Sequence, residues 1–329
     1  MHQASLPGRV LGLLLAGGRK ASGQEMGLRL GVSRSAVGKA VEGLRAQGFV
    51  ITARPRAGYC LEREPEAPLA ARLEARLPAG CLGLPLVHYS AIDSTNLQAR
   101  RLAETGAPHG ACLVAEHQSA GRGRLDRRWT APDGACLLFS LLLRPEALPL
   151  AEVFSLTNLA ALAVCQALEE LCALAPAIKW PNDVYLDGRK LAGILTEFTA
   201  RAERLDYVVV GVGLNVNLDP ARLAELPAPA NSLFAASGRN WDRALVLAAI
   251  LTKADALYAQ LLAGGREVLG QEYNRRSWLT GRRVTVRDGE RVLEGLALGV
   301  AADGALLLEQ SPGQVTTVRH GDVSLLSIQ

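Results

Sequence analysis

The feature that most narrows the fold is the Asp187-Gly188 pair, which lies between two stretches of strand character, Ala177–Leu186 and Lys190–Phe198. An Asp-Gly pair in that position is typical of a type I′ turn, which joins neighbouring antiparallel strands. A purely parallel βαβ sheet is therefore disfavoured. We predict a mixed sheet covered by helices, with further strands at Ala111–Glu116, Cys136–Leu143 and Tyr207–Leu218 and helices at Ser94–Glu104, Glu152–Cys172 and Asp242–Leu262.

The two ends of the chain differ in pattern from this centre. Glu62–Pro68 is polar and contains proline, which is typical of a domain boundary. In the last fifty residues short apolar strands alternate with turn signals such as Asp288-Gly289 and Asp303-Gly304, which predicts a small SH3-like β-barrel. We predict an α+β protein with domains at 1–64, 65–279 and 280–329.

The first sixty residues predict a winged helix-turn-helix. Helical patterns occupy Arg9–Leu15, a stretch from Ser22 to about Leu30, and roughly Arg34–Gln47. Gly31 breaks the second helix, and Ser33 is placed to cap the third. Two helices joined by a short glycine-containing turn favour a helix-turn-helix. Phe49–Thr52 and Ala57–Leu61 then read as two strands around a basic tip.

Charge is unevenly distributed along the chain. Residues 1–60 carry nine Lys/Arg against two Glu, a net charge of +7, whereas the whole chain has +4. This asymmetry favours contact between the N-terminal module and a polyanion. We predict DNA binding, with the third helix in the major groove and the wing on phosphate. The alternative is a helical interaction module with a solvated basic face; the predicted DNA-binding residues are Ser33, Arg34, Ser35, Lys39, Arg54 and Arg56.

Composition is that of an ordinary soluble protein, with 49% hydrophobic and 21% charged residues. No apolar run is expected to span a bilayer, and no secretory signal is expected at the start. The six cysteines form no CxxC pair, so we expect buried reduced thiols and a cytoplasmic location.

The run Gly121-Arg-Gly-Arg-Leu-Asp-Arg-Arg-Trp129 carries the clearest chemical signal. Glycines allow the backbone to approach a ligand, arginine forks suit phosphate and carboxylate, and a tryptophan offers a flat face to a purine. The spacing matches neither a Rossmann fingerprint nor a Walker A motif. By composition alone, a basic loop that binds nucleic acid is an alternative.

The pattern GRGRxxRxW resembles the signature loop of the biotin–protein ligases, and all its fixed positions are present. Other landmarks follow in that family's order. The resemblance covers nearly the whole chain, including both end modules, and implies the bifunctional class of ligase and biotin operon repressor, with a catalytic domain of the class II synthetase-like type. The other landmarks are Asp93–Asn96, Gln118, Lys179–Asp183, Lys190–Gly193 and Gly211–Asn215.

The resemblance implies a biotin site. Hydroxyls and free amides at a helix start suit a ureido oxygen, and a glutamine both donates and accepts. For the helix start, simple capping is the alternative, and for Lys190 it is an exposed lysine at a strand end. The implied biotin-binding residues are Ser94, Thr95, Asn96, Gln118, Arg122, Gly123, Arg124, Lys190, Gly193 and Gly211.

The resemblance also implies an ATP site and Mg²⁺. Lys190 is expected to hold the biotin carboxylate beside the α-phosphate, and Asp183, with Asn182, to order the metal ion. Lys190, Arg124 and Asp183 are the implied catalytic residues, with Asp183 assisting the acceptor amine. For Asn215 the alternative is an ordinary turn asparagine. The implied ATP-binding residues are Arg122, Arg124, Arg127, Trp129, Asn182, Lys190 and Asn215.

Two half-reactions are therefore expected: formation of biotinyl-5′-adenylate, then transfer of biotin to a lysine of a biotin carboxyl carrier domain. The resemblance further implies operator DNA as a partner and a homodimer in the adenylate-bound form. Two alternatives remain open at this point. One is a biotin-sensing repressor without significant ligase activity, and the other is a lipoate–protein ligase.

Overall fold

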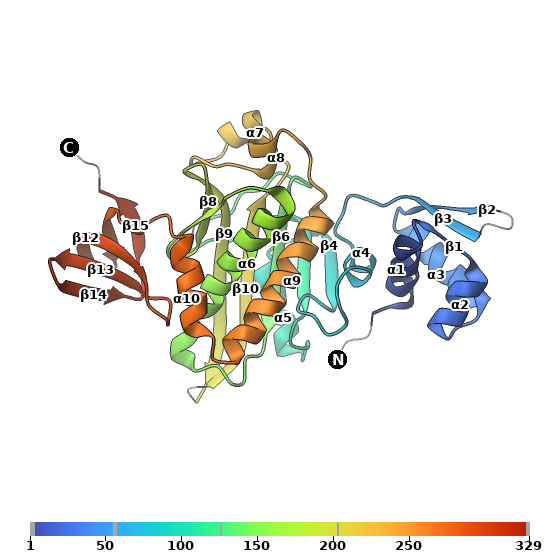
Figure 1. Ribbon diagram of the computed structural model, residues 1–329, viewed down its shortest axis with the longest axis horizontal. Coiled ribbons are helices and arrows are strands. Elements are labelled where there is room, and N and C mark those ends of the chain that lie inside the picture. Colours follow the sequence, from blue (N-terminus) through green and yellow to red (C-terminus); the bar gives the residue numbers. More distant parts are fainter. Residues whose placement is uncertain (1–3, 55–57, 126, 203, 327–329) are drawn as a thin grey trace.

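The computed structural model describes residues 4–54, 58–125, 127–202 and 204–326. Three sheets lie side by side along the longest axis of the molecule (Figure 1). The N-terminal module, the central domain and the C-terminal sheet follow one another along that axis in chain order.

The N-terminal module has the predicted helices and wing strands. Its elements are α1 (Leu6–Ala16), β1 (Lys20–Ala21), α2 (Gly23–Leu30), α3 (Arg34–Ala46), β2 (Val50–Arg54) and β3 (Gly58–Arg63), with sheet order β1-β3-β2. Gly31 ends α2 in the left-handed conformation, and the Ser33 hydroxyl accepts from the Ala36 amide at 3.1 Å. Helix α1 begins before the predicted Arg9, because Ser5 caps it and a proline occupies its first turn.

The segment after the predicted boundary forms a short helix, α4 (Ala70–Glu74), that the sequence analysis missed. It packs on α1, and Ala71 belongs to the N-terminal core. Its Arg72 is only 1% exposed and forms ion pairs with Glu64, at 3.0 Å, and with Asp242. This charged link connects the end of the wing to the central domain. The boundary at residue 64 stays a prediction.

The central sheet has seven strands in the order β4-β5-β6-β10-β9-β8-β7. Only β4 and β5 run parallel, so the predicted mixed sheet is confirmed. Asp187 and Gly188 both have positive φ, as a type I′ turn requires. The strands are β4 (Leu86–Ile92), β5 (Cys112–Gln118), β6 (Cys136–Leu143), β7 (Ala177–Lys179), β8 (Asp183–Leu186), β9 (Arg189–Arg201) and β10 (Arg204–Asn215).

Two sequence predictions for this sheet were wrong or incomplete. The single strand expected at Ala177–Leu186 is a hairpin of β7 and β8, which reverses at Trp180–Asn182. Pro181 has no N–H to continue the ladder there. Strand β4 was not predicted, because its polar residues His88, Tyr89 and Ser90 give an edge strand a weak apolar pattern.

Helices cover both faces of the sheet. Helices α6 (Ser155–Cys172), α9 (Arg243–Leu262) and α10 (Arg266–Arg275) lie side by side on one face (Figure 1). The short helices η1 (Leu150–Glu152), α7 (Pro220–Ala224) and α8 (Leu233–Ser237) complete the domain. Helix α5 (Thr95–Glu104) packs on the other face, over Leu113, Leu142 and Val209.

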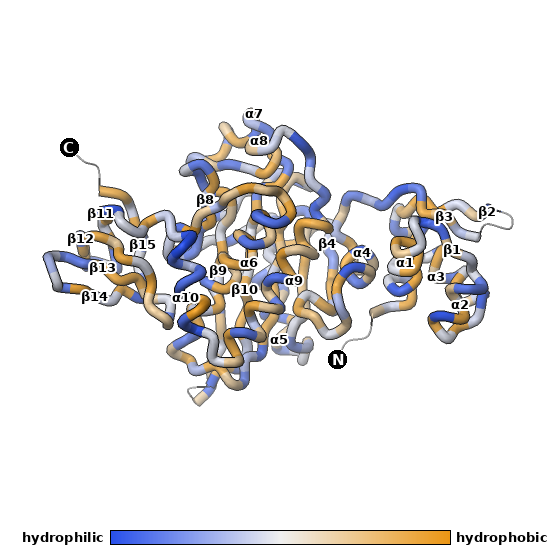
Figure 2. Tube along the Cα trace, viewed as in Figure 1, coloured by the Kyte–Doolittle hydropathy of each residue, from blue (hydrophilic) through white to orange (hydrophobic). Residues whose placement is uncertain are grey.

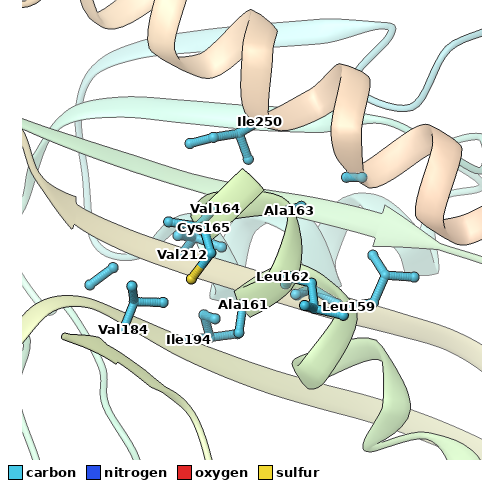
Figure 3. Packing of buried hydrophobic residues seen from close by; sticks show 14 of the residues in the cluster. Leu159, Ala161, Leu162, Ala163, Val164, Cys165, Val184, Ile194, Val212 and Ile250 are labelled. Atoms are coloured by element: carbon cyan, nitrogen blue, oxygen red, sulfur yellow. The ribbon is translucent and has the colours of Figure 1, made fainter. Parts of the chain in front are cut away.

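The expectation that no apolar run could span a bilayer was wrong by length and composition. Leu150–Cys172 and Arg243–Leu262 are both long and apolar enough. Helix α6 is apolar nearly all round because it lies between the sheet and α9 and is buried on most sides. Figure 3 shows residues of α6 packed against Val184, Ile194 and Val212 of three strands and against Ile250 of α9. In Figure 2 much of α6 and α9 is orange, as are parts of the strands of the central sheet.

The C-terminal residues form the predicted β-rich domain. Its five strands are all antiparallel, in the order β14-β13-β12-β11-β15. Val284 and Leu308 belong to the same apolar core as the central domain, and the Trp180 indole donates to the Gly304 carbonyl at 3.1 Å. The strands are β11 (Arg283–Asp288), β12 (Arg291–Val300), β13 (Leu306–Ser311), β14 (Gln314–Val318) and β15 (Asp322–Leu325).

The cysteines are free, as expected. Five are buried and Cys172 is half-buried. Burial is the main cause that raises the pKa of the Cys136 thiol to about 12, so this group stays protonated and unreactive at neutral pH.

Candidate active site

Three glycines form a floor on the sheet face that α5 leaves open. Gly211 and Gly213 lie two residues apart on β10, and Gly193 of β9 pairs with Gly213, so all three share one face. A Cβ at Gly211 would lie 1.9 Å from Asn96 Oδ1, and one at Gly213 would lie 2.4 Å from the Trp129 ring. These strands therefore require glycine, because other side chains rest directly on their backbone.

The start of α5 supplies one end of the site. Ser94 occupies the N-cap position, but its side chain makes no capping hydrogen bond, so simple capping does not account for this residue. The Thr95 amide and hydroxyl donate to Gln118 Oε1, at 2.7 and 3.1 Å. Within the described part of the chain Gln118 Nε2 donates no hydrogen bond, which leaves this donor for a ligand.

Asn96 is fixed by the protein itself. Its Oδ1 accepts from Ser140 at 2.6 Å, and its Nδ2 donates to the Leu195 carbonyl at 3.2 Å and to Glu197 at 2.9 Å. Ser140 and Glu197 were missed by the sequence analysis. The signal for Ser140 was its position as the one hydroxyl in the apolar run Cys136–Leu143. Asn96 thus orders this end of the site through contacts that leave little of its amide free.

The loop Gly121–Trp129 is held by its own backbone. The Gly123 amide donates to the Arg127 carbonyl at 2.7 Å, and the Trp129 amide donates to Gly121 at 3.1 Å. A Cβ at Gly121 would lie 2.4 Å from the Trp129 carbonyl oxygen. The glycine spacing therefore lets the loop fold back on itself and place Trp129 over the glycine floor.

The arginines of this loop diverge. Arg122 reaches Glu197 at 2.9 Å, beside Asn96. Arg124 donates to Asn182 Oδ1 at 3.4 Å and to the Gly321 carbonyl at 3.3 Å, and burial lowers the pKa of its guanidinium. Arg127 forms an ion pair with Asp322. The contact of the loop with the C-terminal domain was not predicted from the sequence.

Lys190 lies near the centre of the site. Its Nζ is 2.7 Å from Asp183 Oδ1 and 5.6 Å from the centre of the Trp129 ring. A Cβ at Gly193 would lie 3.2 Å from the same Nζ, so the ammonium group is over the glycine floor. An exposed lysine at a strand end does not describe this side chain, which is buried in part and paired.

Two asparagines close the opposite end. Asn182 donates to the Ile194 carbonyl at 2.8 Å. Asn215 is the last residue of β10, is 2% exposed and donates to the Asn231 carbonyl at 3.0 Å. It is therefore not an ordinary turn asparagine. Contacts thus connect the glycine floor with α5, Trp129 and Lys190, whereas Arg127 extends to Asp322 of the C-terminal domain.

A resident metal site is not built here. In the described ranges no group of three or more His, Cys, Asp or Glu side chains is placed to hold an ion. Asp183 offers one carboxylate beside Asn182, and one or two carboxylates suffice for Mg²⁺ that arrives on phosphates.

The predicted DNA-binding residues lie apart from this site. Arg34, Ser35 and Lys39 are exposed on α3, whereas the Ser33 hydroxyl is used to cap that helix. Arg54 is 57% exposed and pairs with Glu62 at 3.0 Å. Arg56 lies outside the described residues.

Comparisons with known proteins agree with this architecture. Residues 89–215 match the biotin/lipoate A/B protein ligase family, 9–60 an HTH domain and 279–326 the biotin protein ligase C terminal domain. The bifunctional ligase/repressor BirA of Bacillus subtilis is 36% identical over 94% of this chain and 95% of its own length. That of Escherichia coli is 32% identical, over 96% of each chain.

A solved structure of a biotin protein ligase also matches this chain. The biotin protein ligase from Aquifex aeolicus in complex with biotin and ATP is 30% identical, with a TM-score of 0.63, and covers 73% of this chain and 98% of its own. A helix-turn-helix module, a ligase domain and a C-terminal domain are thus matched in order, and the chain belongs to the biotin protein ligase family, among its bifunctional ligase/repressors.

Proposed function

We propose that this protein activates biotin with ATP and transfers it to a lysine of a biotin carboxyl carrier protein. In the first step a biotin carboxylate oxygen attacks the α-phosphorus of ATP. Biotinyl-5′-adenylate forms and pyrophosphate leaves. In the second step the acceptor amine attacks the acyl carbon, the amide forms and AMP leaves.

The observation that carries the proposal is the position of Lys190 on the glycine floor, beside Asp183 and the Trp129 ring. A carboxylic acid of ordinary pKa is ionised at neutral pH, so the first step needs no general base. It needs two negative groups held together, and the Lys190 ammonium group supplies positive charge where they meet. Arg124, partly buried beside Asn182, adds a second charge.

The two ends of the site suit the two substrates. The unpaired Gln118 donor and the hydroxyls of Ser94 and Thr95 offer a polar wall for the ureido ring. Arg122 and Gly123 lie in the loop that would close over the biotin tail.

The opposite end suits the nucleotide. Trp129 Nε1 is buried without a partner in the described protein, and an acceptor on the nucleotide would satisfy it. We assign Arg127, Asn182 and Asn215 to the same substrate. Mg²⁺ is taken as part of the MgATP substrate, with Asp183 and Asn182 as the oxygen ligands that the protein adds.

We propose that Asp183 accepts the proton that the acceptor amine loses in the second step. Its carboxylate is held at the site by Lys190. Asp183→Asn is expected to slow transfer from preformed adenylate. An unchanged rate of that step would remove the assignment.

The test of the ligase is transfer of a biotin mass from MgATP and biotin to an apo carrier domain. Lys190→Ala is expected to lower the rate of adenylate formation by a factor of about 10² to 10³. Lys253→Ala is the matched control, because Lys253 is also a partly exposed lysine paired with a carboxylate, that of Glu170, but lies on α9. Equal activity of the two variants would contradict the proposed role of Lys190.

We also propose that the protein represses transcription of a biotin operon in the cytoplasm. Arg34, Ser35, Lys39 and Arg54 are proposed to contact operator DNA, together with the capping Ser33 and with Arg56. Two modules on a palindromic operator would require a dimer, which we propose forms in the adenylate-bound state. Operator binding that appears only with biotin and ATP, and that is lost in Lys39→Ala, would support this. A chain that binds biotin and DNA but transfers no biotin would be a sensor-only repressor.

A further inference from the structure

A strap of chain from residue 227 to 231 crosses the site end of β9 and β10. The Asn231 amide donates to the Lys190 carbonyl at 2.8 Å, and the Lys190 amide donates to the Pro229 carbonyl at 3.4 Å. Asn215 Nδ2 donates to the Asn231 carbonyl at 3.0 Å. The backbone of Asn231 therefore touches both the proposed catalytic lysine and the proposed nucleotide asparagine.

The side chain of Asn231 fastens this strap. It is 8% exposed, and its Nδ2 donates to the Leu186 carbonyl at 3.2 Å and lies 3.4 Å from Asp187 Oδ2. Its Oδ1 accepts from the Ser232 amide at 2.9 Å, where α8 begins. One amide thus ties the strap to the β8–β9 turn and to the next helix.

No other side chain in the strap can do this. Residues 227–230 are Pro-Ala-Pro-Ala, which carry no polar side-chain atoms. Each proline also lacks an N–H. The position of the strap over Lys190 therefore depends on the Asn231 amide and on the backbone bonds that it holds in place.

We infer that Asn231 is a positioning residue for the nucleotide half of the proposed site. It acts through the main chain of Lys190 and the amide of Asn215, and this inference rests on the proposed ligase function. Without its side chain, the Leu186 carbonyl loses this hydrogen bond and the Ser232 amide loses its partner. The strap then moves, and Asn215 and Lys190 lose the geometry that holds ATP. The ureido end, at Gln118 and α5, is fastened by other bonds and stays intact.

The test is biotin-dependent exchange between ATP and pyrophosphate, measured on the full chain. Asn231→Ala is expected to raise KM for ATP about tenfold, the effect of one lost buried hydrogen bond, and to raise KM for biotin less, because only the carboxylate of biotin meets Lys190. Asn231→Asp keeps the acceptor for Ser232 but replaces the donor to Leu186 with an oxygen that faces the Leu186 carbonyl and Asp187, and should raise KM for ATP at least as much as Asn231→Ala. Wild-type KM values in either variant would overturn the inference.

The control is Ser237→Ala, in the same part of the chain. The Ser237 hydroxyl also makes two hydrogen bonds, with Leu233 and with Trp241, but contacts neither Lys190 nor Asn215. Ser237→Ala should lower the midpoint of thermal unfolding without a change in KM for ATP. An equal rise of both KM values in Asn231→Ala, with a midpoint lowered as in the control, would mean a merely structural role.

Failure of the proposed function would be visible separately. A wild-type chain without exchange activity would refute the ligase, and ATP affinity measured by calorimetry would then replace KM for ATP. Weaker ATP binding in Asn231→Ala than in Ser237→Ala would still support the positioning role. Equal affinities would overturn it.

Discussion

Replacement of Gly213 by alanine tests whether the glycine floor sets the position of Trp129. A Cβ at this position would lie 2.4 Å from Trp129 Cε2, whereas ordinary contacts begin near 3.4 Å. The ring must therefore move by about 1 Å, a displacement that costs roughly 10²-fold in rate at a site that depends on orientation. The ring cannot retreat freely, because it also packs against the cluster that contains Cys136 and Leu138.

We expect Gly213→Ala to lower kcat/KM for ATP by about 10²-fold, or about 2.7 kcal/mol, in the pyrophosphate exchange assay. Overpacking should also lower the free energy of unfolding by about 1–3 kcal/mol. Gly193→Ala is the matched variant. Its Cβ would lie 3.0 Å from the Trp129 ring and 3.2 Å from Lys190 Nζ, so both neighbours need to move only a few tenths of an ångström and a smaller loss is expected. Wild-type kcat/KM for ATP in Gly213→Ala would refute the reasoning.

Three further predictions concern stability. Arg72→Met removes the ion pairs with Glu64, which keeps Arg76 as a partner, and with the partly exposed Asp242, and should cost about 1–3 kcal/mol in denaturant unfolding; no measurable loss would contradict the buried charged link. Gly43→Ala, in a helix and with no atom within 4 Å of the new Cβ, should stabilise the N-terminal module by about 0.5–1 kcal/mol in thermal melts, with operator affinity unchanged. Burial raises the pKa of the Glu116 carboxyl, but the His88 hydrogen bond and the Arg243 charge outweigh burial and hold that pKa below its ordinary value of 4.5. The carboxylate therefore stabilises the fold above about pH 4.5, and this contribution disappears as the pH falls through the lowered pKa; a Glu116→Gln variant should be less stable than wild type at pH 7 and nearly equal to it at the acid end of a pH series.

Local physics explains what could be predicted from the sequence. The Ser33 cap, the left-handed Gly31 and the Asp187-Gly188 turn depend on hydrogen bonds and steric limits within a few residues, so their positions follow from residue type. Alternation and turn signals likewise predicted that the C-terminal domain consists of short strands. The motif residues between Ser94 and Asn215 can be identified from the sequence because they match the motifs of a known family, which requires no knowledge of their contacts.

The tertiary structure decided which side chains surround that motif. Ser140 and Glu197 meet the motif residues because the strand order places β6 and β9 on either side of β10, and Asn231 meets them because the segment before α8 folds back over the end of β10. The contacts of Gly321 and Asp322 with the loop arginines span almost two hundred residues. Such pairings depend on how whole elements pack, and no local pattern encodes them. The same holds for α6. Its sequence shows only a long apolar helix, and its packing between the sheet and α9 shows that it is a buried core helix.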